Sequence, residues 1–490
     1  MFKSRRQPLD RLAQALMVVL AVVIVGMVLL GDPAASKVRD FTWKDRQVGA
    51  DETSFLISFS RPMDQASVEK NLTIEPPLPG RFSWAGRRMA YTLNFPAPYG
   101  NEFKLSLPQA VDRFGGDRAR FTPFEASFKS RDRAFAYVGI DGDEQGRLML
   151  YNLSTQASEA LTPQDWTVLD FKPYTQGDRI LFAAVDRQLT DQQAQQLYTV
   201  TTGLGNQSLP RGQIETILDS EEYQNLKFDL SPDGQTIVIQ RVNRTNPGDF
   251  GPWVLKLGEE PRPLETEPGG DFIIAPDSQS LLLQQGAGTA IIALSNVENE
   301  QSGDILDFLP QYGLVMDVAD NGSAAAMVNF NQDDPEKRYT QTLFWVSNQG
   351  DEKPLLNVTG AILDAQFDPT NELLFCLTSE LLEGDTYQVQ PSISAVNVKT
   401  DRVEKLWTLP PQPSANVSLA PDGLAVLFDE TVPSANADSS AVVDNGIAIA
   451  TSKMWLLPLY QTSESRLNKQ PQSIEPQAFP FAGINPVWIP

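Results

Sequence analysis

The sequence predicts an all-β protein that begins with an apolar helix. One uninterrupted apolar stretch lies close to the N-terminus, at residues 15–30. Short runs of alternating apolar and polar residues, separated by Pro and Gly, follow it up to about residue 130. A strand–turn–strand unit then recurs to the end of the chain, at the period of about 40 to 50 residues that propeller blades have.

The charge of the chain argues against one class of partner. Its 39 basic and 62 acidic residues give a formal net charge of −23. The first 11 residues carry a net charge of +3, so the remainder carries −26. A polyanion of this size repels phosphate backbones, and we therefore expect no nucleic-acid partner.

Two residue types that often carry chemistry are scarce. There is no histidine, which excludes Ser-His-Asp and Cys-His catalysis and every metal site that needs an imidazole ligand. The one cysteine, Cys376, lies in the apolar run Leu373–Leu377 and is expected to be a small buried side chain. We therefore predict no enzymatic activity, no cofactor, and no catalytic, cofactor-binding or metal-binding residue.

Residues 12–31 are predicted to form a transmembrane helix that acts as an uncleaved signal anchor. Gln14 is the one polar residue between positions 12 and 30, and the stretch is just long enough to cross a hydrocarbon core of about 30 Å. Four basic residues precede it, so the tail of residues 1–11 is expected in the cytoplasm and the rest of the chain on the other side. A cleaved signal peptide is the alternative, although no clear Ala-x-Ala site follows.

Residues 37–131 are predicted to form a β-sandwich. The run Phe55–Ser60 alternates between apolar and polar residues, as a half-buried strand does. About seven such short strands in a segment of this length are typical of two packed sheets.

This segment resembles the Ig-like domains of bacterial surface and periplasmic proteins. Several sequence pieces carry the resemblance in the order that the family has them. They are FSRPMD at residues 59–64, Gly80 with Trp84, Pro98-Tyr99-Gly100, Asp112 with Gly115, and SFKS at residues 127–130. The resemblance implies a spacer or adhesion module that carries out no chemistry.

Residues 132–490 are predicted to form a β-propeller. Six copies of an apolar strand, a tight turn and a second strand recur in this region, with successive turns 44 to 59 residues apart. The turns lie at Pro173, Pro232, Pro276, Asp320, Pro369 and Pro421. Pro-Asp-Gly suits such a turn because Pro presets φ, Asp bonds its own backbone and Gly accepts a positive φ.

The two ends of this region predict how the ring closes. Ala134–Val138 is an apolar strand with no partner strand before it, and Gly483–Pro490 resembles a first strand with no turn after it. The C-terminal strand can therefore complete the blade that the N-terminal strand opens, which leaves no free edge. This count favours seven blades, with six or eight as the alternatives.

The Ser-Pro-Asp-Gly turn at residues 231–234 and the completing C-terminal strand are similar to the TolB-type propellers of bacterial envelope proteins. The resemblance implies a WD40-like propeller and an envelope setting. It does not indicate a particular partner.

Three polar segments are candidate sites. Asp141–Gly146 carries carboxylates like the start of a calcium loop but lacks the late bidentate Glu, so we interpret it as a hairpin loop. Asn331–Glu336 is expected to be a solvated loop. Asp429–Asp444 is a long polar insertion, either a flexible loop or the most specific contact loop of the propeller.

Together these elements predict a membrane-anchored extracytoplasmic scaffold or binding protein. The helix at residues 12–31 would hold it in the inner or thylakoid membrane, and the other domains would lie in the periplasm or lumen. The propeller loops would bind a protein or a cell-envelope partner. The alternatives are an assembly factor for a membrane complex and a His-free glycan hydrolase or lyase that uses paired carboxylates. No such pair can be singled out among the 62 acidic residues.

Overall fold

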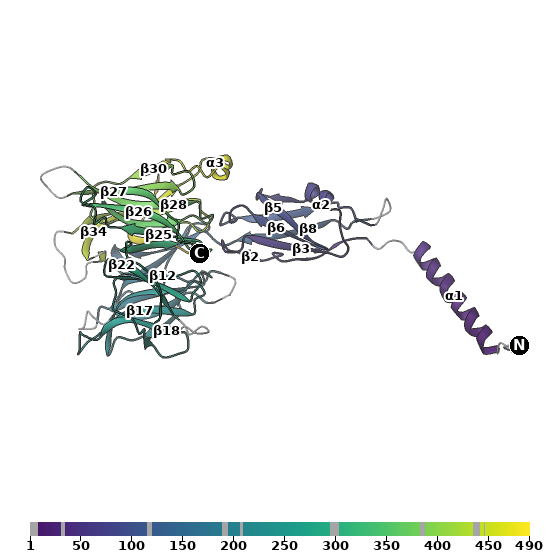
Figure 1. The fold of residues 1–490 in the computed structure, drawn as a ribbon, viewed down its shortest axis with the longest axis horizontal. Helices are drawn as coiled ribbons and strands as arrows, with labels where there is room; N and C mark the ends of the chain where they lie inside the picture. Colours follow the sequence, from purple (N-terminus) through teal and green to yellow (C-terminus); the bar gives the residue numbers. More distant parts are fainter. Residues whose placement is uncertain are drawn as a thin grey trace. The chain divides into compact units, whose positions relative to one another are not determined.

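The computed structural model describes most of the chain, and it shows a protein dominated by β-strands (Figure 1). The described ranges are 8–30, 35–114, 120–188, 195–205, 209–294, 303–382, 388–434, 442–444 and 446–490. In the first of these ranges, side chains are described for residues 12–23 only.

The chain divides into two compact units, which are described separately below. The first comprises Met1–Asp45, Ser54–Leu93 and Glu102–Phe128. The second comprises Arg46–Thr53, Asn94–Asn101 and Lys129–Pro490.

The N-terminal apolar segment forms the helix α1 (Pro8–Leu30). All of its described side chains, at residues 12–23, are exposed. Among the residues that the structure describes, no helix is long and apolar enough to cross a membrane. The predicted span of residues 12–31 extends past the described side chains, and the side chains of the predicted tail, residues 1–11, lie outside them.

Eight strands between residues 38 and 130 form two four-stranded sheets. One sheet has the order β1–β3–β6–β5 and the other the order β2–β8–β7–β4. The strands are β1 (Val38–Phe41), β2 (Gln47–Val48), β3 (Ser54–Phe59), β4 (Thr73–Glu75), β5 (Gly80–Ala85), β6 (Arg88–Leu93), β7 (Glu102–Leu107) and β8 (Phe124–Ser130). A short helix, α2 (Gln65–Asn71), begins where the Asp64 carboxylate accepts a hydrogen bond from the Ser67 N–H.

An aromatic core lies between these two sheets. Phe55 of β3 and Phe128 of β8 are both buried, and Trp43 packs between them with ring centroids 5.2 and 5.1 Å away. In β3 the buried and exposed positions alternate, as its sequence predicts. The sequence therefore predicted the packed sheets correctly, while the Ig-like assignment stays a prediction.

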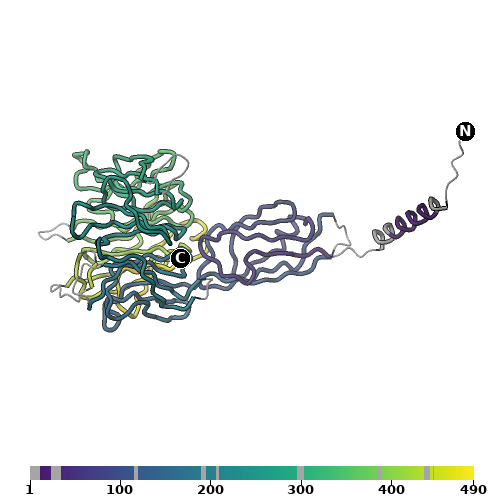
Figure 2. The backbone as a smooth tube through the Cα atoms, turned by 90° about the horizontal axis from the view of Figure 1, so that it is seen from below, coloured from purple at the N-terminus to yellow at the C-terminus, as the bar shows by residue number. Residues whose placement is uncertain are grey.

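The second unit contains seven blades that form a β-propeller. Figure 2 follows the backbone through these repeated antiparallel strands. From the innermost strand outward, blade 1 is β36–β9–β10–β11, blade 2 is β12 to β15, blade 3 is β16 to β19 and blade 4 is β20 to β23. Blade 5 is β24 to β27, blade 6 is β27 to β30, and blade 7 is β31–β32–β34 with β33 and β35. The count of seven agrees with the favoured prediction.

The bounds of the propeller elements follow the chain order. They are β9 (Ala134–Gly139), β10 (Leu148–Asn152), β11 (Ala157–Ala160), β12 (Trp166–Pro173), β13 (Arg179–Asp186), β14 (Gln196–Thr201), β15 (Ile214–Leu218), β16 (Tyr223–Leu230), β17 (Thr236–Asn243), β18 (Phe250–Lys256), β19 (Arg262–Pro263), β20 (Phe272–Ile274), β21 (Ser280–Gln285), β22 (Gly288–Ala293), β23 (Ile305–Leu309), β24 (Leu314–Val318), β25 (Ala324–Asn329), β26 (Thr340–Ser347), β27 (Glu352–Phe367), β28 (Leu373–Leu381), β29 (Val389–Asn397), β30 (Val403–Thr408), β31 (Val417–Leu419), β32 (Ala425–Pro433), β33 (Val443–Asp444), β34 (Ile447–Pro458), α3 (Ser463–Leu467), β35 (Gln477–Ala478) and β36 (Gly483–Trp488).

The ring closes in blade 1, where the C-terminal strand joins the first propeller strand. β36 pairs antiparallel with β9, with Ile484 opposite Val138 and Trp488 opposite Phe135. Both Phe135 and Trp488 are buried. The closure that the two chain ends predict is therefore confirmed.

The strand β27 serves two blades. Its first half pairs with β26 as the outer strand of blade 5, and its second half pairs with β28 as the inner strand of blade 6. Gly360 lies between the halves with a φ of +142°, a conformation that side chains rarely adopt. A Cβ at this position would lie 2.1 Å from the backbone oxygen of Ser379.

Replacing Gly360 with alanine is therefore expected to lower the free energy of unfolding of the propeller by about 2 kcal/mol or more. The matched control is Gly350→Ala, because Gly350 also has a positive φ but no atom lies within 4 Å of its added Cβ. We expect that control to cost about 1 kcal/mol, from backbone strain alone. Urea unfolding measures both losses, and equal losses would contradict the steric account of Gly360.

Candidate functional site: the channel mouth

The two ends of the propeller channel differ in their loops. Short turns such as Pro421-Asp422-Gly423 join the inner strand to the second strand in blades 2 to 7. At the opposite end, where the inner strands begin, the connections between second and third strands are longer in every blade except blade 4. The longest of these joins β32 to β34. Because long loops on a rigid scaffold are the usual place for binding, this end of the channel is the candidate site.

A β-bulge interrupts the inner strands of blades 2, 3, 5 and 6, four residues before the end of the strand in blades 2, 3 and 6 and two residues before it in blade 5. The extra residue at each bulge is apolar, and we call these four residues the bulge ring: Leu169, Leu226, Met316 and Leu363. Leu169, Leu226 and Leu363 expose 43%, 42% and 38% of their surface. Because they lie on innermost strands, they expose this apolar surface to the channel.

A carboxylate follows three of the four bulge residues and caps the bulge. In each case the next backbone N–H donates to the carboxylate oxygen Oδ1 at 2.8 Å. The three carboxylates are Asp170, Asp317 and Asp364. The fourth position, in blade 3, is Lys227.

Buried and half-buried polar side chains also join the inner parts of neighbouring blades. The carboxylate of Asp317 accepts from the N–H of Phe367, which joins blade 5 to blade 6 at 2.8 Å. Three further side chains join neighbouring blades in the same way: Asp229 accepts from the Ile274 N–H, Gln366 from the Leu419 N–H and Asp429 from the Asn485 N–H. We call these three side chains and Asp317 the inter-blade clasps. A buried acceptor that lost its donor would carry an unmet desolvation cost, so each clasp helps fix the ring.

The channel carboxylates hold their protons more tightly than ordinary Asp residues. Burial, with smaller contributions from the nearby Asp364 and Asp320, raises the pKa of Asp317 to about 7 against the opposing effect of two backbone hydrogen bonds. Burial likewise raises the pKa of Asp170, Asp364 and Asp429 to about 6. The structure thus contains several proton-binding groups that titrate near neutral pH.

The negative charge is compensated on one side of the channel only. Lys172 pairs with Asp229, and Lys227 pairs with Asp271. Across the described ranges, no ion pair involves Asp317 or Asp364. The side formed by blades 5 and 6 is therefore the more negative one.

A cavity of about 540 Å³ opens at the channel mouth beside this negative side. We call it the channel-mouth cavity, and its walls combine apolar, amide and carboxylate groups: Leu363, Asp364, residues 413–417, Ile447 and Asn485. Behind one wall, the Asn416 amide donates to the Asp429 carboxylate at 2.9 Å. Its volume lies within the range of ligand-binding pockets.

The hairpin that carries the predicted insertion Asp429–Asp444 borders this site. β32 and β34 extend into a long hairpin, in which Val442 and Ile449 are buried in the same apolar cluster as Leu148 of blade 1. Ile447 of the hairpin lines the channel-mouth cavity. The choice between a flexible loop and a contact loop concerns residues 435–441 and 445, which lie outside the described residues.

The other two polar segments have structural roles. Asp141–Gly146 connects β9 to β10 and contains a 3-10 turn, as the hairpin interpretation predicts. Residues 332–336 form a largely exposed loop, as predicted, but Asn331 at its start is buried and donates to the Thr340 and Thr342 hydroxyls at 2.9 Å. No group of three or more metal-ligating side chains occurs in the part of the chain that the structure describes.

Cys376 is fully buried in β28, as predicted, and burial raises the pKa of its thiol above the ordinary range. Since the thiolate is the nucleophilic form, this environment gives no catalytic cysteine.

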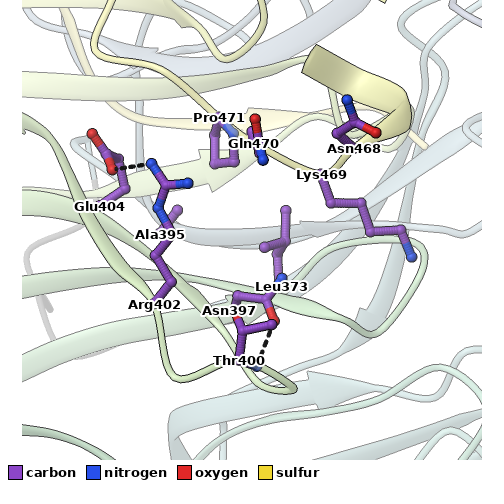
Figure 3. A pocket seen from close by; sticks show the side chains of 10 residues that line it. All are labelled: Leu373, Ala395, Asn397, Thr400, Arg402, Glu404, Asn468, Lys469, Gln470 and Pro471. Carbon is purple, nitrogen blue, oxygen red and sulfur yellow. Dashed lines mark hydrogen bonds and ion pairs between the residues drawn. The ribbon is translucent and has the colours of Figure 1, made fainter. Parts of the chain in front are cut away.

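A second, smaller cavity of about 310 Å³ lies against blade 6 (Figure 3). Its charged side chains already have partners, since Arg402 pairs with Glu404 at 3.0 Å and Lys469 pairs with Glu372 at 2.7 Å. Its charges are therefore compensated, and the channel-mouth cavity is the stronger candidate.

Sequence reasoning found the repeat but not these channel residues. The sequence pattern that could have indicated them is an apolar pair followed by Asp and another apolar residue, which occurs in three inner strands. The three copies are Val168-Leu169-Asp170-Phe171, Val315-Met316-Asp317-Val318 and Ile362-Leu363-Asp364-Ala365.

Comparisons with known proteins give distant structural likenesses only. The sequence matches no protein-family model and no curated protein sequence. Among solved structures, the chain is similar to TolB from Acinetobacter baumannii, with 13% identity and a TM-score of 0.38, over 58% of this chain and 64% of TolB. It is also similar to an oligogalacturonate lyase from Vibrio parahaemolyticus, with 12% identity and a TM-score of 0.40, over 68% of this chain and 92% of the lyase. An oligogalacturonate lyase in complex with manganese gives 12% identity and a TM-score of 0.44, over 87% of this chain and 99% of the lyase.

Proposed function

We propose that this protein is a membrane-attached, extracytoplasmic binding protein whose propeller holds a segment of a protein partner at the channel mouth. The observation that carries the proposal is the channel-mouth cavity. There the exposed apolar side chain of Leu363 lies beside the Asp364 carboxylate, which has no ion-pair partner among the described residues.

The chemistry of the cavity indicates the kind of segment that fits it. Leu363, Ile447 and Pro413 offer apolar surface, while Asp364 offers a negative group at the same wall. A segment with apolar side chains around one lysine or arginine would match both. The propeller region, residues 132–490, holds 49 acidic and 20 basic residues, and its field would speed the approach of such a basic partner.

The apolar helix supports attachment to a membrane. Leu12, Leu16, Met17 and Val22 of α1 are all largely exposed in the structure. Apolar surface of this extent favours a nonaqueous neighbour. Attachment through residues 12–31, with the basic tail in the cytoplasm, would place both compact units in the periplasm or a lumen. An assembly factor that contacts its complex through the helix remains a variant of this proposal.

A second candidate function is a glycan hydrolase or lyase that uses carboxylates. It is favoured by the pKa of Asp317, which burial raises to about 7, and by the pKa of the neighbouring Asp364, about 6. A carboxylic acid that keeps its proton near neutral pH can act as a general acid. Both oxygens of Asp317 accept backbone hydrogen bonds, however, and this structural role accounts for its position equally well.

The proposal is tested with the tagged full chain, cross-linked in its native membranes and purified with its partner. We expect one protein to co-purify reproducibly, and Leu363→Arg to reduce its yield at least five-fold, because the new cation would repel a basic segment and fill the cavity. Val403→Arg is the matched control, since Val403 is a similarly exposed apolar residue on the outer strand β30.

The same preparation separates the two candidate functions. Turnover of polysaccharides or peptidoglycan by the purified chain, lost in Asp317→Asn, would support the enzyme instead. Equal partner yield from Leu363→Arg and the wild type would contradict binding at the channel mouth.

A further inference from the structure

The outermost strand of blade 4, β23 (Ile305–Leu309), is an unusually apolar sheet edge. It pairs with β22 on one side and has no strand on its other side within the described ranges. Ile305, Leu306 and Phe308 expose 55%, 41% and 45% of their surface. Exposed backbone and exposed apolar side chains therefore coincide on this strand.

Three other outer strands of the propeller are better protected against edge pairing. β11 is short and polar, β19 has two residues and ends at Pro263, and β30 carries Glu404 and Lys405. Lysine, proline and short length are the usual means by which proteins prevent a strand from pairing at an edge. β23 contains neither lysine nor proline, so it stands apart from these strands.

The local geometry holds this edge in place. A β-bulge makes Leu306 an extra residue, and the pairing then runs regularly from Asp307 opposite Ile291 to Leu309 opposite Thr289. The Phe308 ring packs across Gly288, where an added Cβ would lie 2.7 Å from its Cζ atom. Phe308 is therefore fixed by its neighbour strand although nearly half of it is exposed.

The charge on β23 favours one kind of partner strand over another. Asp307 is the central residue of β23, it is exposed, and it forms no ion pair with any residue that the structure describes. Opposite charges across a strand pair are stabilising, and like charges are destabilising. A second copy of this chain would bring a like-charged β23 edge and a net charge of −23 to the contact. A partner strand with basic residues would avoid both the like-charge contact with Asp307 and the repulsion between two negatively charged chains.

We propose that β23 is a docking edge for an extended segment of a protein partner in which apolar and basic residues alternate. The segment would add a strand to blade 4 through main-chain hydrogen bonds, its apolar side chains would cover Leu306 and Phe308, and a basic side chain would face Asp307. This edge lies on an outer strand and is independent of the channel mouth.

The test uses the full chain and a fluorescent seven-residue peptide of alternating Lys and Val, followed by fluorescence anisotropy at 0.15 M salt. We expect this peptide to bind at least ten-fold more tightly than the alternating Glu and Val peptide. It should also bind at least ten-fold more tightly than a Lys–Val peptide of the same composition in block order, which carries the same charge but cannot alternate.

Three variants locate the binding. Leu306→Lys should weaken it at least ten-fold, whereas Val403→Lys, the same change on β30, should leave it unaltered. The same comparison of Leu306→Lys with Val403→Lys is made in a Leu363→Arg background, where binding of the peptide at the channel mouth is removed, so that the remaining binding belongs to this edge. Retained folding of each variant is verified by its thermal unfolding curve.

Two results would overturn the proposal. One is binding that Leu306→Lys and Val403→Lys weaken equally, or that does not depend on alternation, since this would reflect net charge alone. The other is a dimer of the full chain in sedimentation that Leu306→Lys dissociates, because a second copy would then be the occupant of the edge.

Discussion

A chain that ends at Ala482 is expected to lose the cooperative unfolding transition of its propeller. Removing residues 483–490 deletes β36, so β9 of blade 1 loses its partner strand and the ring opens. Burial of Ile484, Trp488 and Ile489 alone contributes on the order of 5 kcal/mol, which is comparable to the whole stability of a typical domain.

The loss extends beyond the deleted strand itself. The buried Asp429 carboxylate loses the Asn485 N–H that it accepts at 2.8 Å, and the closure between blades 7 and 1 loses its clasp. The Trp488 side chain no longer donates to the Ser418 backbone oxygen. Buried groups without partners oppose refolding of the shortened ring.

Near-UV circular dichroism and thermal unfolding measure this effect. Addition of a synthetic peptide of residues 483–490 is the control, and we expect it to restore the transition in a concentration-dependent way, because ligands of the folded state stabilise it. A shortened chain that unfolds within about 2 °C of the full chain would show that β36 does not close the ring.

The propeller is expected to be more stable at pH 5 than at pH 8. Burial raises the pKa of Asp317 to about 7 and the pKa of Asp364 and Asp429 to about 6, against an ordinary value of 3.8. Between pH 4 and 7 the folded state therefore binds more protons than the unfolded state. Stability falls as pH rises through this window, because each charge must then be held in a desolvated site.

We expect the melting temperature of the propeller to fall by about 5–10 °C from pH 5 to pH 8. Asp317→Asn should make this slope clearly shallower, since it removes the group with the highest of these pKa values. Asp307→Asn is the matched control: its carboxylate also accepts the next backbone N–H at 2.8 Å, but it is exposed on β23.

Differential scanning calorimetry from pH 4.5 to 8.5 gives the slopes. An unchanged slope in Asp317→Asn, or an equal change in both variants, would show that the channel carboxylates do not control the pH dependence.

The repeat explains why the propeller could be predicted from the sequence. Each blade needs a tight turn after its inner strand, and turn residues such as Pro421, Asp422 and Gly423 are chosen by local backbone geometry. The open first strand at Ala134 and the unmatched last strand at Gly483 then determine the closure, since a free edge is disfavoured. These features depend on neighbours in sequence, so the sequence displays them directly.

The candidate site depends on neighbours in space, which the sequence does not display. Asp364, Asn416, Ile447 and Asn485 come from four separate segments and meet only because the ring closes. The bulges that expose Leu169 and Leu363 are also missed by a strict alternation of apolar and polar residues, since a bulge adds one residue to the pattern. The repeated Asp after an apolar pair was the one local sequence pattern that indicated the site.

The membrane helix remains a prediction for a related reason. The evidence for this helix is the apolar composition of residues 12–31. The insertion of such a segment into a membrane depends on the surrounding lipid and not on contacts within the chain. The propeller needs no such partner to fold, because its apolar faces cover one another.

Site-specific photo-cross-linking in native membranes tests the central claim most directly. A photoreactive amino acid is placed at position 363, in the channel-mouth cavity, and at position 403, on the outer strand β30, and the cross-linked products are identified by mass spectrometry. Binding at the channel mouth predicts one partner protein linked through position 363 and not through 403, with a basic residue near the linked site. A partner linked equally through both positions, or through neither, would contradict it.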